Sequence, residues 1–130
     1  IVGSLYFGRH SGGKPQCCIG FSNPSEAEKL RTFQYDGLVK DEWVGTGLVR
    51  IHRWVFEKMK QEIDNGRWPE CAPRGEDGWY GFFNPIGVRI GEDVSFGRRC
   101  AEIGIQTYVD AGLISLHVGE CFYGPGNTNG

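Results

Sequence analysis

The sequence lacks the features that would assign it to a broad class at once. It contains no apolar run approaching the ~18 residues of a membrane span. Neither sign of charge dominates, because 14 basic and 16 acidic side chains leave a net charge of −2. The basic residues are also scattered along the chain. We therefore expect neither nucleic acid nor an anionic membrane as a partner.

Cysteine pairs at metal-binding or redox spacing are missing too. The five cysteines stand at positions 17, 18, 71, 100 and 121, so their number is odd, two are adjacent and none forms a C-x-x-C pair. Zinc sites and redox motifs use that spacing. We therefore expect reduced thiols, and with them a cytoplasmic location, rather than a disulfide framework.

The sequence does contain enough apolar material for one packed domain. Of its 130 residues, 39% are hydrophobic and 13% aromatic, and a chain of about this length buries roughly two thirds of its unfolded surface. We expect a single domain over residues 1–123 and a flexible tail at 124–130, which is rich in glycine and asparagine. Because the chain begins with Ile1 inside an apolar segment, we expect it to be a fragment of a longer protein.

Strand-like and helix-like patterns alternate along the chain, which predicts an α/β fold. The stretch after residue 52 places apolar side chains at helical spacing, namely Val55, Phe56, Met59 and Ile63. An Asn-Pro-Ser-Glu sequence predicts a helix start near residue 23. The expected strands are 1–7, 16–21, 43–51, 105–109 and about 113–118, and the expected helices begin near 23, 52 and 91. Residues 67–90 show no clear period, so we expect either a functional loop or short strands that the pattern does not resolve.

Two adjacent carboxylates, Glu92 and Asp93, follow a glycine and open the third predicted helix. Apolar residues then repeat at i, i+4 and i+7, and a glycine stands where the helix should end. Acids in a first turn complement the helix dipole, so helix capping is one interpretation of the pair. Residues 75–77 repeat the Gly-Glu-Asp tripeptide, but Gly-Trp-Tyr-Gly follows it, which indicates a turn.

Five segments, taken in their order along the chain, carry a resemblance to a known family. They are 1–7, 43–59, 91–104, 108–110 and 117–119, the last two being Tyr-Val-Asp and His-Val-Gly. This succession resembles the C-terminal, acceptor-side half of a GT-A nucleotide-sugar glycosyltransferase of the inverting, family-2-like kind. The resemblance implies a partial GT-A domain, with a mixed sheet and flanking helices. It also implies transfer of a sugar from a nucleotide-diphosphate donor to a hydroxyl acceptor.

The resemblance assigns roles to the acid pair. Asp93 matches the general base that takes the proton from the acceptor hydroxyl as it attacks the anomeric carbon, and Glu92 would bind acceptor or hold the loop. Such a base must lie within hydrogen-bond reach of the hydroxyl. We expect the helix N-terminus to keep its carboxylate ionised near neutral pH. Arg98 and Arg99 could contact a diphosphate, and a solvated helix face is the alternative.

Two further segments would complete such a site. The resemblance implies that the sugar or acceptor is bound by Trp43, Gly45, Thr46 and Gly47. A glycine-kinked strand packed closely on a neighbour is the alternative for this segment. His117 matches a late histidine that in some relatives contributes to the divalent metal site, whereas a lone histidine at a strand end is more often structural.

The metal motif of the family does not occur in this sequence. A complete GT-A domain holds Mn²⁺ or Mg²⁺ between an Asp-x-Asp motif and the diphosphate, where the ion neutralises the leaving group. No Asp-x-Asp occurs here, and in the family it would fall upstream of Ile1. We therefore expect Mn²⁺ or Mg²⁺ to act in the full-length parent, and donor binding by this chain alone to be weak or absent.

The sequence leaves two other functions open. The first is a non-catalytic interaction module derived from the same fold, which self-associates through an exposed N-terminal strand at 1–7, since an open strand edge is a template for pairing. On the same ground we expect a homo-oligomer. The second is a small hydrolase that uses Asp93 and His117, although no Gly-x-Ser-x-Gly motif supplies a nucleophile.

Overall fold

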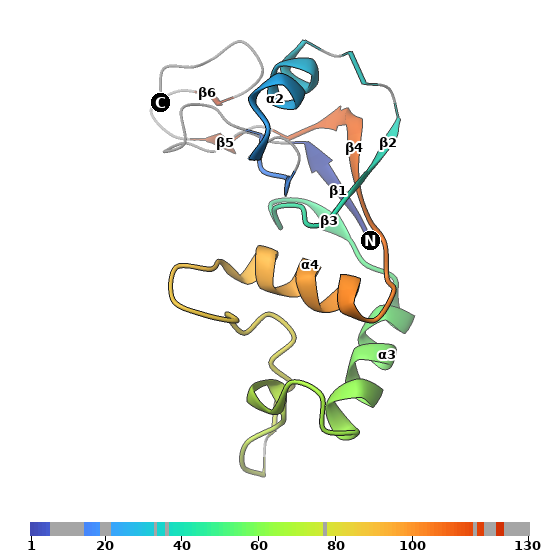
Figure 1. Ribbon diagram of the computed structural model, residues 1–130, viewed down its shortest axis with the longest axis vertical. Helices are drawn as coiled ribbons and strands as arrows, with labels where there is room; N and C mark the ends of the chain where they lie inside the picture. Colours follow the sequence, from blue (N-terminus) through green and yellow to red (C-terminus); the bar gives the residue numbers. More distant parts are fainter. Residues whose placement is uncertain are drawn as a thin grey trace.

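The computed structural model is elongated, with the sheet and the first helix toward one end and the other helices toward the opposite end (Figure 1). It describes residues 1–5, 15–18, 22–32, 34–35, 37–76, 78–115, 117–118 and 122–123. In chain order the elements are β1 (Val2–Leu5), α2 (Pro24–Arg31), β2 (Leu38–Asp41), β3 (Val49–Arg50), α3 (Arg53–Asp64), the 3₁₀ turn η1 (Pro69–Cys71), α4 (Glu92–Glu102), β4 (Thr107–Ile114), β5 (His117–Val118) and β6 (Phe122–Tyr123). The described part is thus an α/β fold, as the sequence predicts, and none of its helices is long and apolar enough to cross a membrane.

The larger sheet is mixed and has the strand order β2-β4-β1-β3. β1 runs parallel to β4, with Val2 beside Tyr108, and antiparallel to β3, with Val2 beside Arg50. β2 is antiparallel to β4. β1 therefore has a neighbour on each side, and the edges of this sheet are β2 and β3. The expectation that the N-terminal strand is an exposed edge is wrong for Val2–Leu5.

The strands differ in extent from the sequence prediction. β2 was not predicted, and only Val49 and Arg50 of segment 43–51 form a strand, while Val44 makes an isolated bridge to Cys17. β4 continues past residue 109 to Ile114, and the register of its pairing with β1 shifts between Ser4 and Leu5. Positions 6–7, 19–21 and the predicted tail lie outside the described residues.

The first helix, α2, begins as its sequence predicts. The Asn23 side chain caps it by accepting hydrogen bonds from the backbone N–H groups of Ser25 and Glu26, at 3.1 and 3.3 Å. Pro24 occupies the first helical position, where its missing N–H leaves no bond unmade. Leu30 is buried and fixes the helix onto the sheet.

The predicted apolar face of α3 is confirmed. Val55, Met59 and Ile63 are buried, and the chain leaves the helix through Gly66, whose φ of +96° suits glycine. Burying a side chain of this size stabilises the fold by about 1.5–3 kcal/mol. The predicted helix α4 is confirmed as well. Lys58 of α3 donates a hydrogen bond to the carbonyl of Ile103, at the C-terminal end of α4, at 2.7 Å. This bond ties the two helices together.

Two hydrophobic clusters hold the molecule together. The sheet core consists of Leu5, Cys17, Leu30, Val44, Val109 and Ala111. The helix core consists of Val55, Met59, Phe96, Cys100 and Ile105, with Phe56, Phe82 and Phe83 packed against it. The rings of Phe83 and Phe96 stack with their centroids 4.3 Å apart. None of the four cysteines among the described residues forms a disulfide.

Candidate functional site

The acid pair lies in the first turn of α4, as predicted. Glu92 is exposed, whereas Asp93 is half-buried and its Oδ1 accepts a hydrogen bond from the Val94 N–H at 2.8 Å. A Cβ at Gly91 would lie 2.8 Å from the same Oδ1. The glycine before the acids therefore lets the Asp93 carboxylate fold back over the start of the helix. Gly75, in the second Gly-Glu-Asp, lies in a turn with φ +77°, as expected.

The environment of Asp93 favours its protonated form. Burial is the main cause that raises the pKa of Asp93, and the neighbouring Glu92 charge adds to it. Hydrogen bonds from the backbone act in the opposite direction but are weaker. Burial thus outweighs the backbone hydrogen bonds at the helix start, and the expectation that this carboxylate is ionised near neutral pH stays a prediction. A pKa shifted toward neutrality makes the group a stronger base.

A cavity of about 310 Å³ opens beside this first turn. It is lined by Cys18, Ser22, Trp43, Arg89, Ile90, Gly91, Val94 and Arg98. α4 comes close to the Trp43 segment because Gly97 has no side chain: a Cβ there would lie 2.5 Å from the Trp43 Cβ and 2.7 Å from the Glu42 carbonyl oxygen. Trp43 and the first turn of α4 thus border one cavity, although Gly91 and Val94 line it there and Glu92 and Asp93 do not.

The other predicted substrate-binding residues do not gather at that cavity. Gly45 is buried and its N–H donates to the Gln16 carbonyl at 2.7 Å. Thr46 and Gly47 are exposed in the turn before β3. Gly45 therefore fits the alternative interpretation of close backbone packing, and only Trp43 of this predicted set lines the cavity.

The charged side chains that line the cavity are those of Arg89 and Arg98. Arg98 pairs with Glu42 at 3.4 Å, and the Cys18 thiol donates to the same carboxylate at 3.9 Å. Burial, followed by the charges of Asp41 and Glu42, raises the pKa of the Cys18 thiol. Arg89 adopts a left-handed backbone, with φ +66°.

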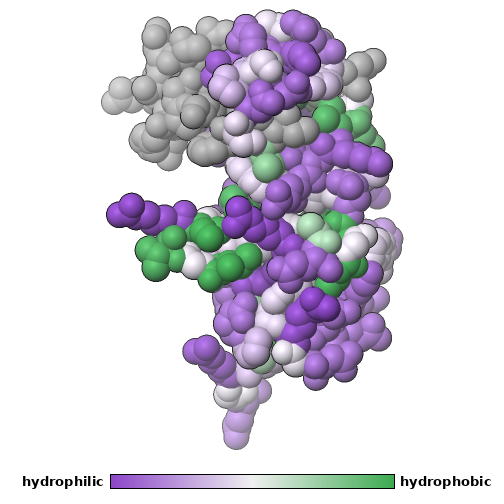
Figure 2. All heavy atoms as spheres, viewed as in Figure 1, coloured by the Kyte–Doolittle hydropathy of each residue, from purple (hydrophilic) through white to green (hydrophobic). Residues whose placement is uncertain are grey.

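The loop that precedes α4, which contains Ile86 and Val88 and reaches the cavity at Arg89, projects from the body of the molecule. Figure 2 shows hydrophobic side chains on it, at the left of the view, beside polar ones. Val88 is 92% exposed and Ile86 44% exposed. On its inner side the loop is bound to α4 through Ser95, whose Oγ accepts from the Ile86 N–H at 3.0 Å and donates to the Gly91 carbonyl at 2.8 Å.

Arg99 has a role that the sequence prediction missed. Its side chain is fully buried, and Nη1 donates to the carbonyls of Phe82 and Asn84, at 3.2 and 2.6 Å. Nη2 pairs with Glu70 Oε1 at 3.2 Å. Arg99 therefore neither meets a diphosphate nor lies on a solvated face. Its position three residues after Phe96, on the apolar face of the helix, was the signal that could have shown this.

His117 lies in β5, opposite Tyr123 of β6 and in a different sheet from β4. The sequence predicts one strand at about 113–118 that ends with this histidine, and the structure divides that segment between two strands. Its side chain is outside the described residues. Within the described part, no three or more His, Cys, Asp and Glu side chains come together as a metal site would require.

No family model matches this sequence, and no similar protein was found among curated proteins or among solved structures.

Proposed function

We propose that this chain forms the acceptor side of an inverting glycosyltransferase, with Asp93 as the general base. The observation that carries the proposal is that the first turn of α4 and Trp43 border one cavity. The order of the sequence motifs, which resembles the GT-A family, supports the same assignment.

In this reaction Asp93 accepts the proton of the acceptor hydroxyl. The hydroxyl oxygen forms a bond to the anomeric carbon while the bond from that carbon to the diphosphate oxygen breaks. The diphosphate leaves with the electron pair, and the configuration of the carbon inverts. The raised pKa of Asp93 supports this role, because a base whose pKa lies nearer the working pH accepts a proton more readily.

The family's metal ion would neutralise the diphosphate. The described residues do not offer a cluster that fits Mn²⁺ or Mg²⁺, so no step is assigned to an ion on this chain. Arg89 and Arg98 are the cationic side chains at the cavity. Their charges suit an anionic leaving group.

The test is sugar transfer by the chain within its native flanking sequence. Asp93→Asn should lower kcat at least ~100-fold with little change in KM, since a general base acts in the transition state. Asp77→Asn makes the same chemical change in the second Gly-Glu-Asp and should leave kcat unchanged. Equal losses in both variants, or transfer by Asp93→Asn at the wild-type rate, would reject the role of Asp93.

The second candidate is self-association without catalysis, and the open edges of the sheet favour it. Leu38 on β2 is 55% exposed, and Leu48 beside β3 is 53% exposed. Pairing would use one of these edges and not β1. Light scattering that finds a clean 14.5 kDa monomer at high micromolar concentration would reject the homo-oligomer.

A further inference from the structure

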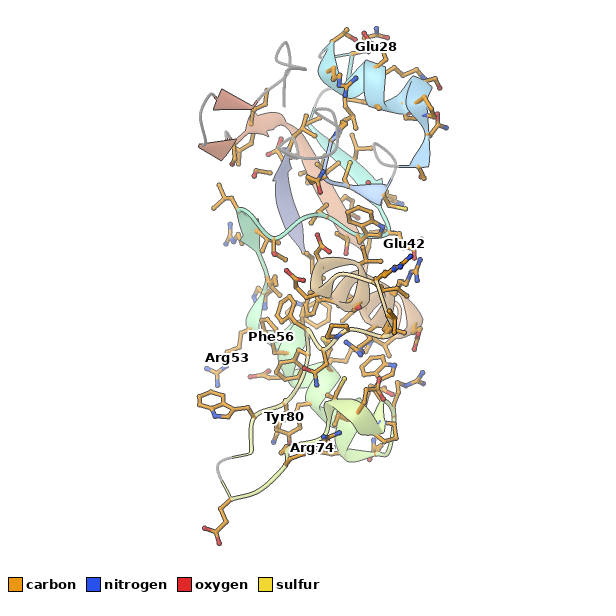
Figure 3. All side chains as sticks on the ribbon, turned by 90° about the vertical axis from the view of Figure 1, so that its left-hand side faces the viewer. Glu28, Glu42, Arg53, Phe56, Arg74 and Tyr80 are labelled. Atoms are coloured by element: carbon orange, nitrogen blue, oxygen red, sulfur yellow. The ribbon has the colours of Figure 1, made fainter. Side chains whose placement is uncertain are left out.

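A second cavity, of about 490 Å³, lies between η1 and the segment that follows it. Its lining residues are Glu70, Ala72, Arg74, Trp79, Asn84 and Pro85. Figure 3 shows Arg74 at the end of the molecule opposite Glu28 of α2, remote from the sheet. The cavity shares no lining residue with the one beside Asp93.

Trp79 is the most unusual feature of this cavity. The side chain is 88% exposed, whereas Trp43 is 9% exposed. The backbone before it packs closely, since a Cβ at Gly78 would lie 2.4 Å from the Pro73 Cβ. The Gly81 N–H also donates to the Cys71 carbonyl at 2.8 Å. The indole of Trp79 is thus exposed to water where the segment that carries it contacts η1 and Pro73.

Arg99 binds two of the residues that line the cavity, Glu70 and Asn84. The guanidinium binds the Glu70 carboxylate and the Asn84 carbonyl. The Asn84 side chain in turn donates to the Glu70 carbonyl at 3.1 Å, in space that Gly81 leaves open. Groups fixed before a ligand arrives lose little conformational freedom on binding. Glu70 and Asn84 are therefore preorganised, although the cavity is open to solvent.

We propose that this cavity binds a neutral oligosaccharide. A sugar ring has an apolar C–H face, which packs against an indole, and a rim of hydroxyls that donate and accept hydrogen bonds. Trp79 offers the aromatic face, Glu70 accepts, Arg74 donates and Asn84 can do both. The Glu70 carboxylate lines the cavity, whereas its partner Arg99 does not, and this negative charge disfavours a phosphate there. The volume lies within the range of small-ligand sites, about 300–1,000 Å³.

Saccharide binding here is independent of the proposed transfer reaction, because it needs neither Asp93 nor a donor. If both hold, residues 85–89 connect the two cavities, since Pro85 lines one and Arg89 the other. The oligosaccharide would then be the acceptor or a part of it. Binding without transfer would contradict the proposed function alone, and transfer without binding at Trp79 would contradict this inference alone.

The test is NMR observation of the four tryptophan indole N–H signals during titration with cellotriose, maltotriose or inorganic phosphate. One trisaccharide should shift the Trp79 signal with a dissociation constant of about 1–10 mM, and phosphate should not. Trp79→Ala should weaken binding about tenfold, because it removes the stacking surface. Trp54→Ala is the matched control, since Trp54 is 46% exposed on α3 and should have no effect on binding.

A second variant tests the polar side of the cavity. Glu70→Gln keeps an oxygen for Arg99 but removes the negative charge, and it should weaken binding about fivefold. Circular dichroism should show an intact fold for Trp79→Ala, whose side chain is exposed, and it serves as the control for Glu70→Gln, because Glu70 pairs with the buried Arg99. No shift of the Trp79 signal with either trisaccharide, a larger shift with phosphate, or equal losses in Trp79→Ala and Trp54→Ala would overturn the proposal.

Discussion

The sheet core and the helix core are stabilised by different means. The sheet core is aliphatic apart from Cys17, and strand pairing between distant segments brings it together, as in the parallel pair β1 and β4. The helix core contains Phe96, is covered by the rings of Phe56, Phe82 and Phe83, and lies next to a buried arginine that binds the backbone of the neighbouring loop. This difference indicates which part of the molecule offers candidate binding sites. Both candidate cavities border loops that side-chain hydrogen bonds hold onto α4.

Arg99→Ala tests that difference most strongly. The substitution removes three charge-assisted hydrogen bonds and leaves the carbonyls of Phe82 and Asn84 without this donor. We expect a loss of about 3 kcal/mol in the free energy of unfolding. Urea denaturation measures the loss, and hydrogen exchange should show faster exchange of the Gly81 and Asn84 amides.

Arg98→Ala is the matched control for this experiment. Arg98 is the preceding residue of the same helix, and its ion pair with Glu42 is about half exposed. Exposed ion pairs contribute roughly 0–1 kcal/mol. If Arg99→Ala is no more destabilising than Arg98→Ala, the buried arginine does not hold the loop, and the two regions differ less than their contacts suggest.

Gly97→Ala tests the contact between the two regions. Alanine is the better helix former by about 1 kcal/mol, so helix propensity alone predicts stabilisation. The new Cβ would instead meet the Trp43 Cβ at 2.5 Å and the Glu42 carbonyl oxygen at 2.7 Å, and backbone atoms cannot easily move away. We expect a net destabilisation of about 1–2 kcal/mol, measured by urea denaturation.

A neutral or stabilising Gly97→Ala would show that α4 does not press on the Trp43 segment. The reference substitution is Ala101→Gly, at an exposed position of the same helix. It should destabilise by about 1 kcal/mol through propensity alone. Comparing the two variants separates the effect of the steric clash on the free energy of unfolding from the effect of helix propensity.

The smallest effect is expected for Asp93→Asn, and it depends on pH. The pKa of Asp93 is raised in the folded protein, so the folded state binds the proton more tightly than the unfolded state. Stability is therefore lost as the pH rises from the ordinary aspartate pKa of about 3.9 through the raised value. Asparagine avoids this loss and should stabilise at pH 7 by less than about 1 kcal/mol, because solvent screens a half-buried charge.

Urea denaturation at both ends of that pH range checks the prediction. The advantage of Asp93→Asn should disappear at low pH, where Asp93 is protonated in both states. Glu92→Gln, at the exposed position of the same turn, should remain within about 0.5 kcal/mol of the wild type. A destabilised Asp93→Asn at pH 7 would mean that the charge is needed to cap α4.

The same division between regions explains what the sequence could predict. α3 and α4 are set by local periodicity and by glycines at their ends, so their positions followed from residues within each segment. β2 has no such signal, because Leu38–Asp41 becomes a strand only by pairing with β4, far along the chain. The approach of Trp43 to the start of α4 depends on the space at Gly97. It could be expected from the resemblance but not from local pattern.

The buried cysteines make it possible to measure how often each region of this molecule opens. Cys17 lies in the sheet core and Cys100 in the helix core, and neither has exposed surface. Burial raises the pKa of the Cys100 thiol to about 12, and a thiol reacts with alkylating reagents only as the accessible thiolate. The rate at which each cysteine is alkylated therefore reports how often its own region opens. Equal rates would mean that the two ends of the molecule unfold as one unit, and unequal rates that one end opens while the other stays closed.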